Sequence, residues 1–145
     1  MKPRCVLIVG CGIAGQVLAC ALAKRGIGCE LVELKPAFDI IGAGMYVQSN
    51  ALRALADIGV ADEIVARGWH AADDISHIAD RDGNLLTAFK IPRIAGPAYP
   101  GVNPIQRHTL HEILHAAVKR AGVPLRMGCT VESIDVSDDV AQVRF

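Results

Sequence analysis

The sequence predicts an α/β fold in which helices pack on a buried parallel sheet, and three observations support this. Hydrophobic residues make up 52% of the 145 residues and charged residues 21%, which is enough apolar material for one packed domain. Aromatic residues make up only 4%, so the core consists mainly of Ala, Val, Ile and Leu, as in buried parallel sheets. Near the start of the chain, two short apolar runs flank a segment rich in Ala and Leu, which gives the order strand, helix, strand.

The first three elements follow from local signals. Arg4–Val9 is a short apolar run bounded by glycine, as expected of a strand that is buried on both faces. Gly12–Arg25 predicts a helix that stops at Lys24-Arg25-Gly26, because cations in the last turn followed by glycine end helices. Cys29–Leu34 predicts the second strand, which Pro36 ends. The joints are short, so a right-handed parallel crossover is the expected connection.

The other elements are assigned from apolar periodicity and from glycine and proline. We expect helices over Ser49–Ile58, Ala61–Ala66 and Arg107–Ala121, a hairpin of Ile75–Ala79 and Leu85–Phe89, and strands near Leu125–Met127, Thr130–Val136 and Val140–Phe145. The last strands predict the start of a β-meander. The glycine-rich segment Ile41–Met45 is expected to be a connection, and Ile91–Pro104, with four prolines and two glycines, an irregular loop.

A glycine-rich turn lies between the first predicted strand and helix. Gly10-Cys11-Gly12-Ile13-Ala14-Gly15 matches the pattern G-x-G-x-x-G. Gly10 permits a tight turn, Gly12 lets the backbone approach a pyrophosphate, and Gly15 lets the helix pack closely on the strand. The N-terminus of the helix offers N–H donors and a partial positive charge to phosphates.

An acidic residue lies at the expected distance from this turn. Glu33 ends the second predicted strand, 18 positions after Gly15, close to the usual interval of about 20. Its carboxylate can accept the ribose hydroxyls of an adenosine and repels a 2′-phosphate, so NADP is disfavoured at this site. The turn and the acid together predict a Rossmann-type site for the ADP half of a dinucleotide.

A second motif competes with this interpretation. His111-Glu112-Ile113-Leu114-His115 spells H-E-x-x-H, the zinc-protease signature, and Glu132 could be a distant third ligand. However, His111, His115 and Lys119 fall opposite the apolar stripe of the predicted helix, so we expect these histidines to face water. No metal site is predicted, and a zinc hydrolase remains an alternative function.

Charge and cysteine content limit the partners and the compartment. Fifteen basic residues balance fifteen acidic ones, which gives no electrostatic reason to expect nucleic acid or a membrane as partner. The five cysteines are odd in number and contain no C-x-x-C pair, which favours a reduced, cytoplasmic protein. The basic Met1–Arg4 and the apolar Cys5–Ala23 also resemble a secretory signal or a short membrane span. The spaced glycines and the acid-ended second strand favour the folded interpretation.

Several stretches together match one enzyme family in the family's own order. They are Val9–Gly15, Leu31–Glu33, Ile41–Met45, Ser49–Leu55 with Ile58–Val60, and Ile105–Leu110 with Leu114. On these residues, the sequence resembles the N-terminal part of class A flavin-dependent (FAD) aromatic monooxygenases of the salicylate and 3-hydroxybenzoate hydroxylase type.

The resemblance implies a set of FAD contacts. Gly10, Gly12, Ile13, Ala14 and Gly15 would hold the pyrophosphate, Glu33 the ribose, and Leu34 and Lys35 would lie near the adenosine. Ala43, Gly44 and Met45 would pass beside the flavin, Arg107 would reach the phosphate–ribityl region, and the backbone of Val131 would lie against the adenine.

The resemblance also implies a function. In this family NAD(P)H reduces the flavin and an aromatic substrate is hydroxylated. Family members are much longer, so residues 1–145 are expected to be the N-terminal portion of an FAD-binding domain, with the substrate domain absent and no catalytic residue assigned. The alternatives are a non-catalytic fragment that binds ADP or FAD, and a non-hydroxylating flavin relative such as a halogenase, epoxidase or reductase. Unpaired strand edges predict a homo-oligomer.

Overall fold

The computed structural model describes residues 5–38, 42–138 and 140–145. The chain divides into two compact units, which are described separately. The first unit consists of Met1–Ile41 and Leu114–Phe145, and the second unit is Gly42–Ile113. Arg4 and Ile41, which the sequence places at the start of a strand and of a connection, lie outside the described residues.

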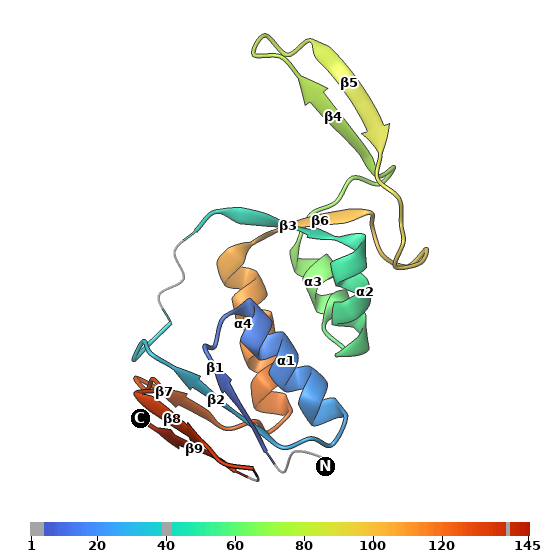
Figure 1. Ribbon diagram of the computed structural model, residues 1–145. Coiled ribbons are helices and arrows are strands. Elements are labelled where there is room, and N and C mark those ends of the chain that lie inside the picture. Colours follow the sequence, from blue (N-terminus) through green and yellow to red (C-terminus); the bar gives the residue numbers. More distant parts are fainter. Residues whose placement is uncertain (1–4, 39–41, 139) are drawn as a thin grey trace. The chain divides into compact units, whose positions relative to one another are not determined.

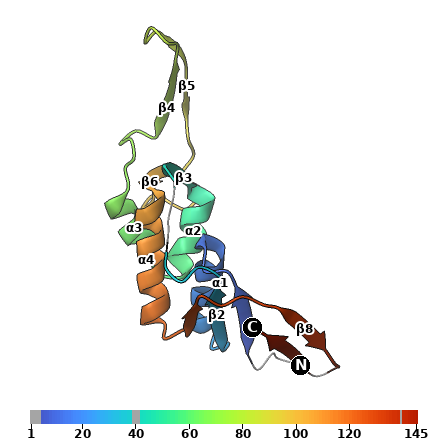
Figure 2. The same ribbon diagram turned by 90° about the vertical axis from the view of Figure 1, so that its left-hand side faces the viewer.

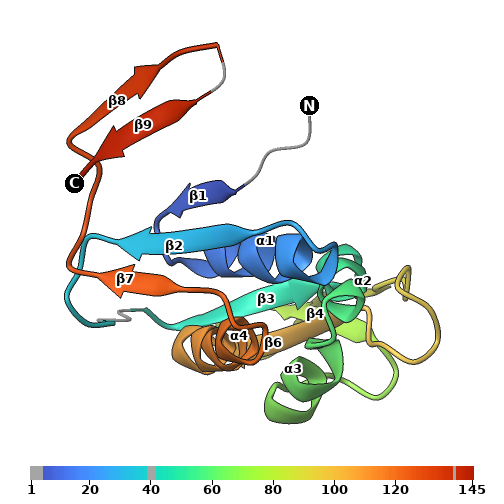
Figure 3. The same ribbon diagram turned by 90° about the horizontal axis from the view of Figure 1, so that it is seen from below.

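A parallel sheet forms the centre of the first unit (Figure 3). Its strands are β1 (Val6–Val9), β2 (Cys29–Glu33) and β7 (Leu125–Met127), in the order β1-β2-β7, and helix α1 (Ile13–Lys24) connects β1 to β2. Val6 pairs with Cys29 and Leu31 pairs with Leu125, both in parallel register. The predicted strand–helix–strand unit is confirmed, with Leu34 just beyond the end of β2.

Apolar burial and a glycine stop explain these elements. Leu31 and Val32 of β2 are fully buried, as expected of a strand that is covered on both faces. Helix α1 ends at Lys24, and Gly26 follows with φ +69°, a left-handed conformation that glycine adopts readily. The helix therefore ends at the predicted stop signal, Lys24-Arg25-Gly26.

The first unit also contains a two-stranded antiparallel sheet, β8 (Ser133–Val136) and β9 (Ala141–Arg144). The strands are shorter than the predicted Thr130–Val136 and Val140–Phe145. Ile134 pairs with Val143, and the side chains of Ile134 and Val136 are 57% and 78% exposed. One face of this hairpin therefore presents apolar side chains to solvent.

The second unit joins a short antiparallel sheet, two helices and a projecting hairpin (Figures 1 and 2). Its elements are β3 (Gly44–Gln48), α2 (Ser49–Asp57), α3 (Ala61–Arg67), β4 (Ile75–Ala79), β5 (Leu85–Lys90) and β6 (Val102–Gln106). Strand β3 pairs with β6, and β4 pairs with β5. Helix α4 (Arg107–Arg120) begins in this unit, and the division between the units falls within it. The predicted helices and the β4–β5 hairpin are confirmed.

Two predicted irregular segments are wrong in part. Gly44–Gln48 and Val102–Gln106 form strands β3 and β6, which pair from Gly44↔Gln106 to Gln48↔Val102. The predicted connection therefore ends before Gly44, and the predicted loop ends before Val102. Pro104 has no backbone N–H to donate to a neighbouring strand. It is tolerated in β6 because β3 and β6 form a two-stranded sheet, so the outer edge of each strand has no partner that would need a hydrogen bond from an N–H.

Two histidines of α4, His111 and His115, do not face water as the sequence predicts. His111 is only 7% exposed, and His115 is half-buried. The ring of His115 lies 4.9 Å from that of Phe38, at an interplanar angle of 71°. The prediction of solvated histidines is wrong because α4 is covered over more of its surface than its apolar stripe indicates. Among the described residues, no helix is long and apolar enough to cross a membrane.

Candidate dinucleotide-binding site

The glycine-rich turn between β1 and α1 depends on glycine at two positions. Gly10 has φ +101°, which strongly favours glycine, and its N–H donates a hydrogen bond to the carbonyl of Val32 over 2.7 Å. A Cβ at Gly15 would lie 2.1 Å from the carbonyl oxygen of Gly10. The turn and the first turn of α1 therefore touch backbone to backbone, which only glycine at position 15 allows.

The N-terminus of α1 has no side-chain cap. Gly12 is the N-cap residue, with no side-chain cap and no acidic residue in the first turn. The N–H of Gln16 makes the first helical bond, to Gly12 over 3.0 Å, so the preceding N–H groups have no acceptor within the helix. A Cβ at Gly12 would meet nothing within 4 Å, which leaves room for a phosphate.

Glu33 ties the end of β2 to the glycine-rich turn. Its Oε2 accepts a hydrogen bond from the N–H of Cys11 over 2.9 Å, and its Oε1 accepts one from the N–H of Lys35 over 3.0 Å. The carboxylate is half-buried at the mouth of the turn. Two bonds to backbone N–H groups fix its position, which suits an acceptor for ribose hydroxyls.

The loop after β7 is fastened beside Glu33. The N–H of Cys129 donates to the carbonyl of Glu33 over 2.8 Å, and the N–H of Gly128 donates to that of Lys35 over 3.0 Å. Val131, half-buried, follows in the same loop, and Leu34 and Lys35 are exposed. The first unit thus brings together the segments that carry the predicted pyrophosphate, ribose and adenine contacts.

The remaining predicted contacts lie together in the second unit. Gly44 pairs with Gln106 at the end of the β3–β6 ladder, and the N–H of Arg107 donates to the carbonyl of Ala43 over 3.3 Å. Gly42 has φ +146°, and a Cβ there would lie 3.2 Å from Cδ of Arg107. The ladder therefore places Arg107 next to the segment that contains Ala43, Gly44 and Met45.

The sequence profile of the FAD-binding domain family matches residues 4–145. The chain belongs to this family. The geometry of the first unit fits the cofactor: open helix N–H groups for the pyrophosphate and a fixed carboxylate for the ribose. The predicted class of cofactor, FAD, and the resemblance to class A flavin monooxygenases are confirmed.

Two curated relatives are monooxygenases of aromatic compounds. The chain is 29% identical over 146 residues to 6-hydroxynicotinate 3-monooxygenase of Bordetella bronchiseptica, covering 99% of this chain and 37% of the relative. It is 35% identical over 143 residues to 3-amino-4-hydroxybenzoate 2-monooxygenase of Streptomyces cremeus, covering 97% of this chain and 35% of the relative. The chain thus spans little more than a third of the length of these relatives.

A solved structure has the same fold. The tetrameric form of 2-methyl-3-hydroxypyridine-5-carboxylic acid oxygenase matches with a TM-score of 0.76 at 20% identity, over 99% of this chain and 38% of that one. At this identity the match supports the fold, including the α/β class predicted from the sequence.

The H-E-x-x-H segment of this FAD-binding domain does not resemble a metal centre. The carboxylate of Glu112, which would be the general base, forms an ion pair with Arg67, with Nη2 and Oε2 2.7 Å apart. Across the described parts of the chain, no group of three or more His, Cys, Asp or Glu side chains is arranged to hold a metal. The histidines instead contribute to the packing of α4.

Two residues that support the turn, Cys11 and Gln16, were missed by sequence reasoning. The N–H of Cys11 is the donor that anchors Glu33, and the side chain of Gln16 donates to the carbonyl of Cys11 over 3.0 Å. Gln16 is fully buried, and its Oε1 has no hydrogen-bond partner among the described residues. Gln16 is the one polar side chain in the apolar run from Cys5 to Ala23, and this was the available signal for it. Nothing in the sequence pattern marked the amide of Cys11.

The thiol of Cys11 is expected to resist alkylation and disulfide reagents. Burial and the nearby carboxylate of Glu33 raise the pKa of this thiol from 9.0 to about 11. At pH 8 only about one molecule in a thousand then carries the reactive thiolate. Ellman's reagent should therefore label the exposed Cys5 quickly and Cys11 only after unfolding. Fast labelling that is lost in Cys11→Ser and kept in Cys5→Ser would contradict this account.

Proposed function

We propose that this chain provides the FAD-binding part of an NAD(P)H-dependent flavoprotein that hydroxylates an aromatic substrate, with the first unit holding the ADP half of FAD. The observation that carries the proposal is the fixed geometry of the first unit. An uncapped helix N-terminus lies next to a carboxylate that hydrogen bonds to the N–H of Cys11 in the same turn. Aromatic substrates and a complete hydroxylase are proposed from relatives that are almost three times as long.

Most of the predicted residues have a separate role in this proposal. The N–H groups of the Gly10–Gly15 turn bind the pyrophosphate, Glu33 accepts the ribose hydroxyls, and the loop with Val131 lies against the adenine. Ala43–Met45 and Arg107 contact the flavin side of the cofactor. When bound, FAD supplies the redox chemistry, and the chain contributes binding, orientation and electrostatics.

The alternatives differ in what they require of the turn. A non-catalytic module would bind ADP as well as it binds FAD, and a halogenase, epoxidase or reductase would use the same turn with a different substrate. A zinc hydrolase would require His111 and His115 to share a metal. The buried His111 and the ion pair of Glu112 do not favour that use. A cytoplasmic location is part of the proposal and is supported by five free thiols.

The visible absorption spectrum tests the proposal. The purified chain is mixed with excess FAD and dialysed, alongside Gly12→Val, whose side chain fills the space left for the phosphates. We expect the wild type to retain more flavin than the variant, and added ADP to displace it. Equal loss of flavin from both proteins, with no effect of ADP, would overturn the proposal.

Self-association is the second part of the proposal, and light scattering tests it. The apolar face of the β8–β9 hairpin is exposed, and unpaired strand edges favour pairing with another copy. We expect a dimer or larger oligomer at high protein concentration, and Val136→Lys should shift the mass towards the monomer. A wild-type chain that remains a monomer throughout would contradict this expectation.

A further inference from the structure

Helix α1 contains one buried polar side chain that none of the predicted FAD contacts uses. Gln16 is the fourth residue of this helix, and its side chain is fully buried. The other buried residues of α1, Ala19 and Cys20, are small and take no charge at neutral pH. An amide that leaves water without complete hydrogen bonding costs free energy. Packing alone therefore does not explain why glutamine occupies this position.

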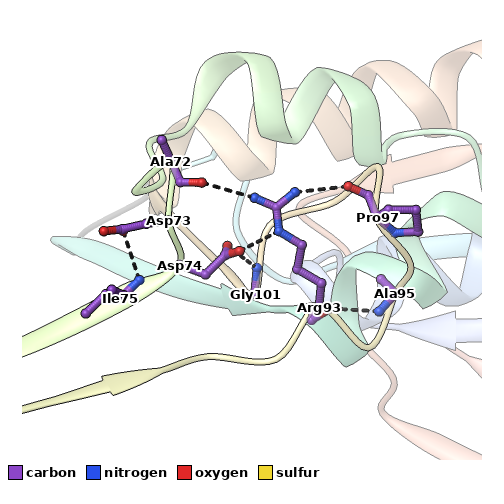
Figure 4. Close-up of polar contacts among 9 residues, drawn as sticks. Ala72, Asp73, Asp74, Ile75, Arg93, Ala95, Pro97 and Gly101 are labelled. Atoms are coloured by element: carbon purple, nitrogen blue, oxygen red, sulfur yellow. Dashed lines mark hydrogen bonds and ion pairs between the residues drawn. The ribbon is translucent and has the colours of Figure 1, made fainter.

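Only one end of the Gln16 amide is hydrogen bonded. Its Nε2 donates to the carbonyl of Cys11 over 3.0 Å, whereas its Oε1 has no partner among the described residues. The buried carboxylate of Asp74, in the second unit, is fully satisfied by comparison. One of its oxygens accepts a bond from Arg93, and the other accepts a bond from the N–H of Gly101 over 2.9 Å (Figure 4). Gln16 therefore keeps an unpaired oxygen for the sake of a single bond to Cys11.

The bond from Gln16 orients the peptide group that joins Cys11 to Gly12. This peptide is trans, and in a trans peptide the C=O and the N–H point in opposite directions. Its C=O points at the buried Nε2 of Gln16, so its N–H, which belongs to Gly12, points away from Gln16. Gly12 is exposed, and its N–H has no acceptor among the described residues. The bond therefore keeps this N–H available to an acceptor from solvent.

The orientation of this peptide decides whether the turn attracts or repels an anion. Rotation about ψ of Cys11 and φ of Gly12 would exchange the positions of the C=O and the N–H, and glycine resists such a rotation least. The C=O would then face the phosphates and repel their negative charges. In the observed orientation the N–H of Gly12 instead adds a donor beside the uncapped N-terminus of α1. The bond from Gln16 thus stabilises the orientation that suits a phosphate.

The ribose side of the turn is held by different bonds. The N–H of Cys11 donates to Oε2 of Glu33 over 2.9 Å, and the N–H of Gly10 donates to the carbonyl of Val32 over 2.7 Å. Neither bond involves the carbonyl of Cys11, which accepts from Gln16. Loss of the Gln16 bond is therefore expected to affect a ligand that has phosphates more than one that has only the adenosine.

We propose that Gln16 is a positioning residue for the pyrophosphate: its side-chain amide holds the Cys11–Gly12 peptide so that the N–H of Gly12 faces the phosphates. Gln16 itself does not contact the cofactor. The proposal rests on the proposed function, in which the Gly10–Gly15 turn binds the ADP half of FAD.

Gln16→Met tests the proposal, because methionine is unbranched like glutamine and has no N–H to donate. The substitution removes the donor to Cys11 and the unpaired Oε1 together, so the two effects on stability offset each other. We expect the melting temperature to stay within about 3 °C of the wild type. The affinity for ADP should fall about tenfold, because one phosphate donor is no longer held in place. Adenosine, which has no phosphate, should bind both proteins alike.

Calorimetry with ADP, NMR titration with adenosine and a thermal melt measure these three quantities. In the NMR spectrum, the amide signal of Gly12 should shift on addition of ADP in the wild type and shift less in Gln16→Met. Cys20→Ala is the matched control, since Cys20 is buried one turn further along the same helix. This control should lower the melting temperature and leave the affinity for ADP unchanged, which separates the stability of α1 from the orientation of the peptide.

The outcomes separate this proposal from the proposed function. Equal affinity for ADP in the wild type and in Gln16→Met overturns the positioning role and leaves the FAD assignment standing. A variant that fails to fold, or that loses affinity for ADP and adenosine equally, shows that Gln16 has a structural role and also overturns the proposal. A wild-type chain that binds no ADP overturns both the positioning role and the proposed function.

Discussion

Gly15→Ala is expected to lower the thermal stability of the chain and to abolish measurable ADP binding. The new Cβ would lie 2.1 Å from the carbonyl oxygen of Gly10, a backbone atom that cannot move without opening the turn. Overpacking of this kind costs about 1–3 kcal/mol, and more where backbone must shift. The measurement is a thermal melt together with a calorimetric titration with ADP.

Gly12→Ala is the matched control for this substitution. Gly12 has φ −75° and ψ −175°, which alanine adopts readily, and a Cβ there meets nothing within 4 Å. We expect a melting curve close to that of the wild type but ADP affinity lowered by about tenfold or more, because the methyl group occupies the approach to the pyrophosphate. If Gly15→Ala melts and binds ADP as the wild type does, the close contact between turn and helix has no role.

Glu33→Ala is expected to lower the affinity for ADP about a hundredfold. A carboxylate that accepts hydrogen bonds contributes about 1.5–3 kcal/mol per bond, and each 1.4 kcal/mol is a factor of about ten. The substitution also removes the acceptor for the N–H groups of Cys11 and Lys35. Part of the loss therefore comes from a less ordered turn, and Glu33→Gln, which keeps one acceptor oxygen, should lose less.

A second ligand separates ribose recognition from turn ordering. The wild type should bind 2′-deoxy-ADP about tenfold more weakly than ADP, because one hydroxyl donor to Glu33 is gone. In Glu33→Ala the two ligands should bind alike, since the acceptor is absent in both cases. Equal discrimination against 2′-deoxy-ADP in the wild type and the variant would show that Glu33 does not contact the ribose.

Local signals predicted the first unit well, and long-range pairings were missed. The turn, α1 and the acid at the end of β2 are encoded within a short segment by glycine spacing and apolar runs. Strands β3 and β6 were missed because Gly44 and Pro104 are unfavourable strand residues. Their pairing joins positions about sixty residues apart, from Gly44↔Gln106 to Gln48↔Val102.

The side-chain contacts were the least predictable part. Asp74 and Arg93 are 19 positions apart and belong to no sequence motif, so only the folded hairpin base brings them together. His111 was expected in water because periodicity describes one apolar stripe, whereas burial depends on everything that covers the helix. The anchoring of Glu33 by Cys11 uses a backbone N–H, which residue identity does not reveal.

Calorimetric titration of the chain with ADP and then with riboflavin tests the central claim most directly, because FAD consists of ADP joined to riboflavin. The account predicts one-to-one binding of ADP, competition between ADP and FAD, and no effect of riboflavin on the ADP titration. Binding of riboflavin without binding of ADP, or displacement of ADP by riboflavin, would contradict the assignment of the Gly10–Gly15 turn and Glu33 to the ADP half of the cofactor.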